Sequence, residues 1–119
     1  MKRIDLENKR VLISRTDSIG DVMLTLPICA WLKDEFPGVK VLFLGKSYTA
    51  PIVQCYSSAV DEFVNWDDYI NVPKTDKIQN FRNLELDAII HVFPSKDIAA
   101  LAKKARVPVR VAAGVLLII

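Results

Sequence analysis

Residues 11–27 read VLISRTDSIGDVMLTLP, and this stretch decides the fold. Residues 11–14 form a short apolar run with β-branched side chains, which is typical of a strand covered on both faces. A polar turn follows, and a helical pattern then extends over residues 20–36. Phe36-Pro37-Gly38 predicts the end of that helix, because proline disfavours helix for the residue before it and glycine permits the turn.

The same alternation continues along the chain. Apolar runs predict further strands at residues 39–44, 60–66, 87–92 and 107–111, and helical patterns occur at 49–56, 75–84 and 95–105. In the first helix we expect an apolar stripe to face the core, made of Ile19, Val22, Met23, Leu26 and Ala30 and, less regularly, Leu32 and Phe36. Strands and helices that alternate with short connections predict an α/β fold, a doubly wound and mostly parallel Rossmann-like sheet.

Composition excludes several classes of protein. The 119 residues are 51% hydrophobic and carry a net charge of +2 with both signs interspersed, so we expect one globular domain and no nucleic-acid partner. The first ten residues lack the apolar stretch of a signal peptide, which favours a cytoplasmic protein. Cys29 and Cys55 have no metal-binding or redox spacing, so we expect two reduced, buried thiols, no metal site and no cofactor.

In an open parallel sheet, ligands bind beyond the carboxyl ends of the strands, beside the point where the strand order reverses. Two segments qualify, residues 15–21 after the first strand and residues 91–96 after the fourth. In the first, Ser18 is placed to cap the helix, Gly20 permits close approach to the backbone, and Asp21 lies where the helix dipole favours a carboxylate. Such a turn suits an anionic ligand, but spacing alone favours Asp21 as a simple helix-capping residue.

Three familiar motifs do not fit. Gly45-Lys46-Ser47 resembles the end of a P-loop. That motif requires a glycine five positions earlier, where this sequence has Lys40. The first turn also lacks the glycine triplet of a dinucleotide-binding fold. A phosphorelay receiver needs a lysine after the last strand, and residues 111–113 offer none.

The residues do resemble those of the heptosyltransferases, glycosyltransferase family 9. The resemblance rests on Ser18, on Gly20-Asp21-Val22, on Thr25-Leu26-Pro27 and on Phe36-Pro37-Gly38, in this order after an apolar strand. The later segment 86–111, LDAIIHVFPSKDIAALAKKARVPVRV, is similar to the family's fourth strand, the helix after it and the next strand. The resemblance extends over nearly the whole chain to about Val111.

This resemblance implies the N-terminal half of a two-lobed GT-B glycosyltransferase, which transfers heptose from ADP-heptose to the lipopolysaccharide inner core with inversion. It implies that Asp21 is the general base, and Ser18 and Gly20 are then placed to contact the phosphates of the donor. The candidates for binding the acceptor at the same sheet edge are Arg15, Thr16, His91, Ser95 and Lys96. We expect Pro27 to bend the helix and direct its first turn toward the cleft. An enzyme of this kind works at the inner face of the cytoplasmic membrane.

The sequence departs from the family pattern near its end. The motifs of the C-terminal lobe, which grips most of the nucleotide sugar, are absent, and residues 112–119 form an apolar tail or the start of an interdomain connection. An exposed apolar tail favours pairing with another copy, so a homodimer is one expectation. The alternative to an acceptor-binding lobe (residues 1–111) is a non-catalytic binding or assembly domain, or a remnant without transferase activity.

Overall fold

The computed structural model describes residues 4–56 and 58–112. Within these residues five parallel strands form one sheet in the order β3-β2-β1-β4-β5. The strands are β1 (Arg10–Ser14), β2 (Lys40–Gly45), β3 (Glu62–Asn65), β4 (Ala88–His91) and β5 (Val109–Ala112). All five predicted strands are therefore present, and the predicted doubly wound α/β class is confirmed.

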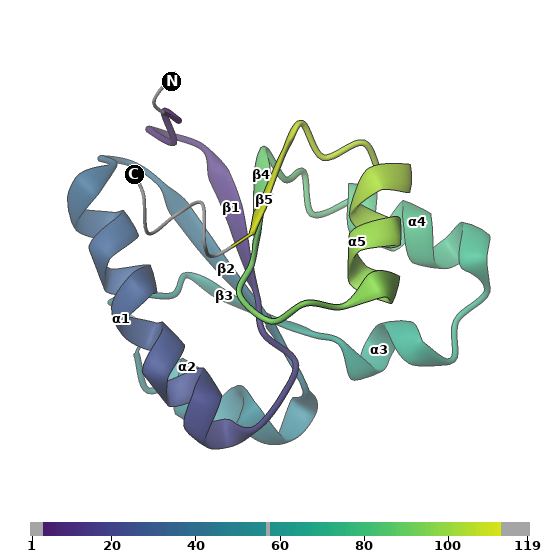
Figure 1. Cartoon of the computed structure of the whole chain (residues 1–119), viewed down its shortest axis with the longest axis horizontal. Coiled ribbons are helices and arrows are strands. Elements are labelled where there is room, and N and C mark those ends of the chain that lie inside the picture. Colours follow the sequence, from purple (N-terminus) through teal and green to yellow (C-terminus); the bar gives the residue numbers. More distant parts are fainter. Residues whose placement is uncertain (1–3, 57, 113–119) are drawn as a thin grey trace.

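The helices lie on both faces of this sheet (Figure 1). One face carries α1 (Ile19–Glu35) and α2 (Ala50–Gln54), and the other carries α3 (Asp67–Ile70), α4 (Lys74–Arg82) and α5 (Lys96–Lys104). The four predicted helices are confirmed to within a few residues. The short α3 and the 3-10 turn at Ser47–Thr49 were not predicted, because neither is long enough to show a period.

Each face of the sheet has its own hydrophobic core, and successive residues of β1 alternate between them. Val11 and Ile13 pack with the α1 and α2 side, whereas Leu12 packs with the α4 and α5 side. All three side chains are fully buried. This alternation is the reason why the strand reads as a continuous apolar run in the sequence.

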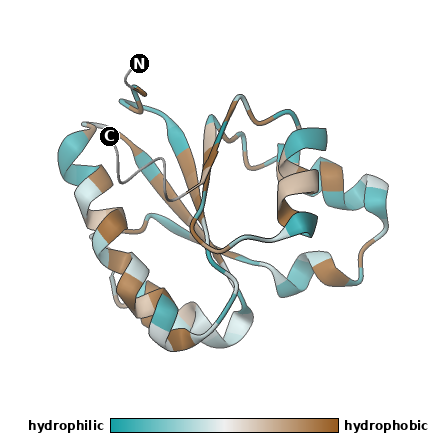
Figure 2. Cartoon of the chain, viewed as in Figure 1, coloured by the Kyte–Doolittle hydropathy of each residue, from teal (hydrophilic) through white to brown (hydrophobic). Residues whose placement is uncertain are grey.

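The predicted apolar stripe of α1 is wrong in part. Val22 and Leu26 are buried as expected, but Ile19 and Met23 are 41% and 50% exposed, and Ala30 is exposed as well. Leu32 and Phe36 are buried as predicted, and the buried positions of α1 that the predicted stripe lacks are Thr25 and Cys29. Much of the ribbon of α1 is coloured hydrophobic (Figure 2), and the hydrophobic Leu24 and Trp31 are exposed, so hydropathy alone cannot select the face that packs on the sheet.

Two further predictions concern the turn after α1 and the cysteines. Gly38 has φ +77°, and a Cβ there would lie 2.0 Å from the side-chain oxygen of Asn8, so the turn requires glycine as predicted. Cys29 is buried and its pKa rises to about 12, since burial disfavours the thiolate. The prediction that Cys55 is buried is wrong: it caps the short α2 at the surface. Of the predicted apolar tail at 112–119, Ala112 belongs to β5, and residues 113–119 lie outside the described residues.

Candidate functional site

The point where the strand order reverses lies between β1 and β4. The chain leaves β1 toward α1 on one face and leaves β4 toward α5 on the other, and β1 has β2 on its far side. Ser14 and His91, the last residues of the two strands, are directly paired in register. The Ser14 carbonyl also accepts hydrogen bonds from Val92 N and Phe93 N. The two segments predicted to carry function therefore start side by side at one sheet edge.

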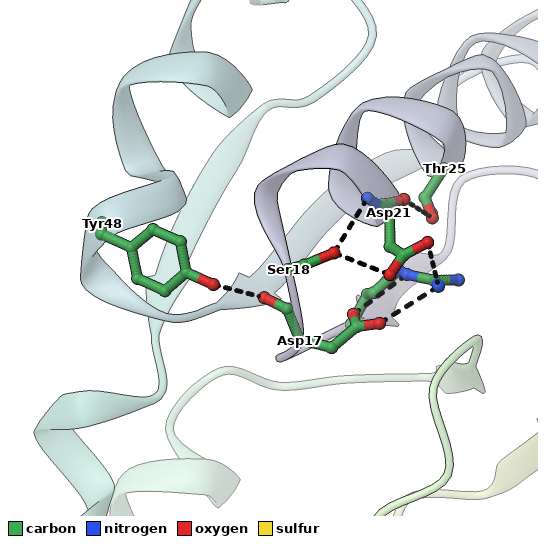
Figure 3. A network of polar contacts seen from close by, with 6 residues as sticks. Asp17, Ser18, Asp21, Thr25 and Tyr48 are labelled. Atoms are coloured by element: carbon green, nitrogen blue, oxygen red, sulfur yellow. Dashed lines mark hydrogen bonds and ion pairs between the residues drawn. The ribbon is translucent and has the colours of Figure 1, made fainter.

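Ser18 organises the start of α1. It has extended backbone angles, and its Oγ accepts a long hydrogen bond of 3.4 Å from the Asp21 amide, as an N-cap residue does. The same hydroxyl donates to Asp21 Oδ2 at 2.7 Å (Figure 3). Thr25 Oγ1 then donates to the Asp21 carbonyl at 2.9 Å, which fixes the backbone one turn further along the helix.

Arg15 joins two carboxylates across this turn. Its Nε lies 3.0 Å from Asp17 Oδ1 and its Nη2 lies 3.3 Å from Asp21 Oδ1. The side chains of Arg15 and Asp17 are 19% and 18% exposed, whereas that of Asp21 is 44% exposed. The guanidinium thus neutralises Asp17 in a sheltered position and orients Asp21 toward solvent.

Asp17 and Tyr48 belong to this network, although sequence reasoning did not select them. The Tyr48 hydroxyl donates to the Asp17 carbonyl at 2.8 Å and connects the turn after β1 to the turn after β2 (Figure 3). The spacing Arg-x-Asp at residues 15–17 was the one available signal for Asp17. Nothing in the sequence near Tyr48 indicates its long-range partner.

The network sets the ionisation of Asp21. The hydrogen bond from Ser18 is the largest of the effects that hold the pKa of this carboxyl below its ordinary value; desolvation opposes it, and the charge of Arg15 adds to it. Asp21 is therefore ionised at neutral pH, with part of the carboxylate open to solvent. Such a group accepts a hydrogen bond from a sugar hydroxyl readily, but as a weak base it takes a proton only late in a reaction.

Two other predicted residues of this turn differ in access. Gly20 is exposed, and a Cβ added there would meet no atom within 4 Å, so the helix start is open to an approaching molecule. Thr16 is only 8% exposed. Thr16 is consequently less accessible to an acceptor than the other predicted contacts.

The segment after β4 forms a separate open groove. This groove has a volume of about 420 Å³, and His91, Pro94, Ser95, Lys96 and Ala99 line it. Ser95 Oγ accepts a 3.4 Å hydrogen bond from Ile98 N, so the residue caps α5 as predicted. Lys96 is exposed and has no ion-pair partner among residues 4–56 and 58–112. The groove brings together three of the predicted acceptor contacts, but not Arg15 or Asp21.

His91 and its neighbour Ser14 leave polar atoms unpaired. The Oγ of Ser14 and the Nδ1 of His91 are both buried and lack a hydrogen-bond partner in the described part of the chain. Burial first, and the charge of Arg110 second, lower the pKa of His91, so the imidazole is neutral at pH 7. Ser14 was not predicted as a site residue. The sequence feature that could have identified it is its position as a polar residue at the end of an apolar strand.

The described residues offer no site for a metal ion, since no three histidine, cysteine or acidic side chains among them cluster suitably. Nor does any helix in the described ranges have the length and apolarity that crossing a bilayer requires.

Comparison with solved structures supports the resemblance to the heptosyltransferases. The chain is similar to a family 9 glycosyl transferase from Veillonella parvula, with a TM-score of 0.74 and 20% identity over 92% of this chain and 33% of that one. It is similar to the E. coli ADP-heptose lps heptosyltransferase II, with a TM-score of 0.71 and 16% identity over 87% of this chain and 30% of that one. At these identities the likeness shows the fold.

A third similar structure is more alike in sequence. The E. coli heptosyltransferase WaaC with ADP has a TM-score of 0.60 and 27% identity over 87% of this chain and 34% of that one. The chain thus spans about a third of the length of these structures. No family model and no curated protein matches the chain. The predicted resemblance to family 9 and the Rossmann-like fold are confirmed.

Proposed function

We propose that this chain is the acceptor-binding lobe of an inverting family 9 glycosyltransferase that moves a heptose from a nucleotide sugar of the ADP-heptose type to a lipopolysaccharide core acceptor. The observation that carries the proposal is Asp21, an ionised and half-exposed carboxylate beside the reversal point of the sheet. The similarity to heptosyltransferases supports the class of reaction.

In the proposed reaction an acceptor hydroxyl attacks the anomeric carbon of the donor. A new C–O bond forms, the bond from that carbon to the diphosphate breaks, and the nucleoside diphosphate leaves with the electron pair. The proton of the hydroxyl passes to Asp21. Because Arg15 and Ser18 keep this carboxylate weakly basic, proton transfer comes late, after bond formation has acidified the hydroxyl.

Ser18 and Gly20 are the proposed contacts to the donor phosphates. Backbone amides at a helix start favour anions, and the open space beside Gly20 admits a phosphate group. The Ser18 hydroxyl already donates to Asp21, so it donates to a phosphate only by giving up that bond. The amides around Gly20 are therefore the stronger part of this contact.

On the acceptor side, Lys96, Ser95 and His91 are the proposed contacts, because they share one open groove. Arg15 lies against two carboxylates, so we assign it to orienting Asp21 rather than to gripping the acceptor. The proposal places this reaction at the inner face of the cytoplasmic membrane. Most of the donor contacts then come from a second lobe beyond these 119 residues.

The test is calorimetric titration of the protein with a soluble lipopolysaccharide inner-core fragment and, separately, with ADP-heptose. We expect the core fragment to bind, and Asp21→Asn to weaken that binding by about tenfold, the cost of one charge-assisted hydrogen bond. Asp34→Asn is the matched control, because Asp34 lies exposed in the last turn of the same helix. If the folded protein does not bind the core fragment, the proposal is overturned and a non-catalytic assembly domain is favoured.

A further inference from the structure

A second groove lies between α4 and α5, on the face of the sheet opposite α1. The two helices pack side by side there (Figure 1). The groove has a volume of about 430 Å³, which falls in the range of small-molecule sites. Its rim includes Lys74 and Lys77 from α4 and Lys104 from α5.

Lys74, Lys77 and Lys104 line one groove, and no ion pair neutralises them among the described residues. A side-chain contact with Lys74, then desolvation and finally the charge of Lys74, lower the pKa of Lys104. Asp97 lines the same groove, yet none of the three lysines has a carboxylate within ion-pair distance in the part of the chain that the structure describes. Like charges held together without a counter-charge favour an anion between them.

Helix stability accounts for Lys104 but not for Lys74 and Lys77. Lys104 lies in the last turn of α5, where the helix dipole favours a cation. Lys74 and Lys77, in contrast, lie near the start of α4, where the dipole disfavours a cation, and Asp76 lies between them in the first turn. Two lysines beside one aspartate leave a net positive charge at this helix start, which an anionic ligand in the groove would offset.

The floor of the groove is apolar. Trp66 and Leu101 contribute to it and are 9% and 4% exposed. The Trp66 ring stacks on Tyr69 at a centroid distance of 5.6 Å, which fixes the indole in place. A rigid aromatic floor under a cationic rim suits a ligand with an apolar part and an anionic group.

We propose that the groove between α4 and α5 binds a phosphate ester that carries a compact apolar group, with Lys74, Lys77 and Lys104 around the phosphate and the apolar part over Trp66. This site is separate from the sheet edge of the proposed transferase function. The same chemistry occurs in a soluble phosphate ester and in the headgroup region of an anionic phospholipid.

The test is a titration with phenyl phosphate as the probe. NMR chemical shifts of the Trp66 indole and of the backbone amides of α4 and α5 report its binding. Inorganic phosphate and phenol test the two halves of the ligand separately. We expect phenyl phosphate to bind more tightly than either half. In the double variant Lys74→Glu, Lys104→Glu we expect binding to weaken at least about tenfold.

Lys103→Glu is the matched control, because Lys103 is exposed on the same helix and does not line the groove. A parallel arm measures sedimentation with phosphatidylglycerol vesicles against phosphatidylcholine vesicles. The site is supported if either probe binds saturably, the double variant loses this binding and Lys103→Glu keeps it. The probe that binds then shows whether the ligand is a soluble phosphate ester or an anionic phospholipid. Equal losses in both variants, or no binding of either probe to the folded protein, would overturn it.

Discussion

The candidate site at the sheet edge has two halves, residues 15–21 after β1 and residues 91–96 after β4, and their polar contacts differ. After β1, hydrogen bonds and ion pairs join Arg15, Asp17, Ser18 and Asp21 in a compact network. After β4, in contrast, Lys96 has no ion-pair partner among the described residues, and His91 Nδ1 is buried without a hydrogen bond. The first half is organised before any ligand arrives, which suits a group that must be oriented for chemistry. The second half leaves the exposed ammonium group of Lys96 for a ligand to pair with.

The largest expected effect comes from removing the centre of the organised half. Arg15→Ala leaves Asp17 and Asp21 without their shared cation in a sheltered turn, so we expect the free energy of unfolding to fall by about 2 kcal/mol. Lys96→Ala, in the open half, should change it by less than about 0.5 kcal/mol. Urea denaturation measures both. Equal effects of the two substitutions would erase the contrast between the halves.

Ser18→Ala has a smaller and pH-dependent effect. Losing the cap should cost about 1 kcal/mol at pH 7. The Ser18 hydrogen bond holds the pKa of Asp21 below 3.8, so the stabilisation is complete well above that pH and is lost as the pH falls through the folded-state value. The difference between the wild type and Ser18→Ala should therefore shrink in acid. Denaturation curves at pH 7 and pH 3 measure it, and a difference that grew in acid would contradict this assignment.

Gly20→Ala separates folding from binding. No atom lies near the added methyl group, and alanine favours helix, so we expect stability to rise by about 0.5 kcal/mol. The same methyl group obstructs the amides that we propose for the donor phosphates, so affinity for ADP-heptose should fall. Thermal unfolding and calorimetry measure the two effects. A stable variant with unchanged affinity would remove Gly20 from the donor contact.

The sequence predicts this edge well where local chemistry decides, and less well where long-range packing does. The strands, the cap at Ser18 and the glycine turn at Gly38 follow from short patterns, and the structure contains each of them. The buried face of α1 could not be predicted, because apolar residues surround the helix and contact with the sheet selects the face. The bond from Tyr48 to Asp17 joins residues 31 positions apart, beyond the reach of any local pattern.

The most direct test of the central claim is an NMR titration of the isotopically labelled protein with the soluble inner-core fragment. We expect the amides of residues 15–21 and 91–96 to shift together and to saturate at one affinity, because we propose that the acceptor reaches from the groove after β4 to Asp21 in the turn after β1. Shifts confined to one of the two turns, or to residues away from this edge, would contradict a shared acceptor site beside Asp21.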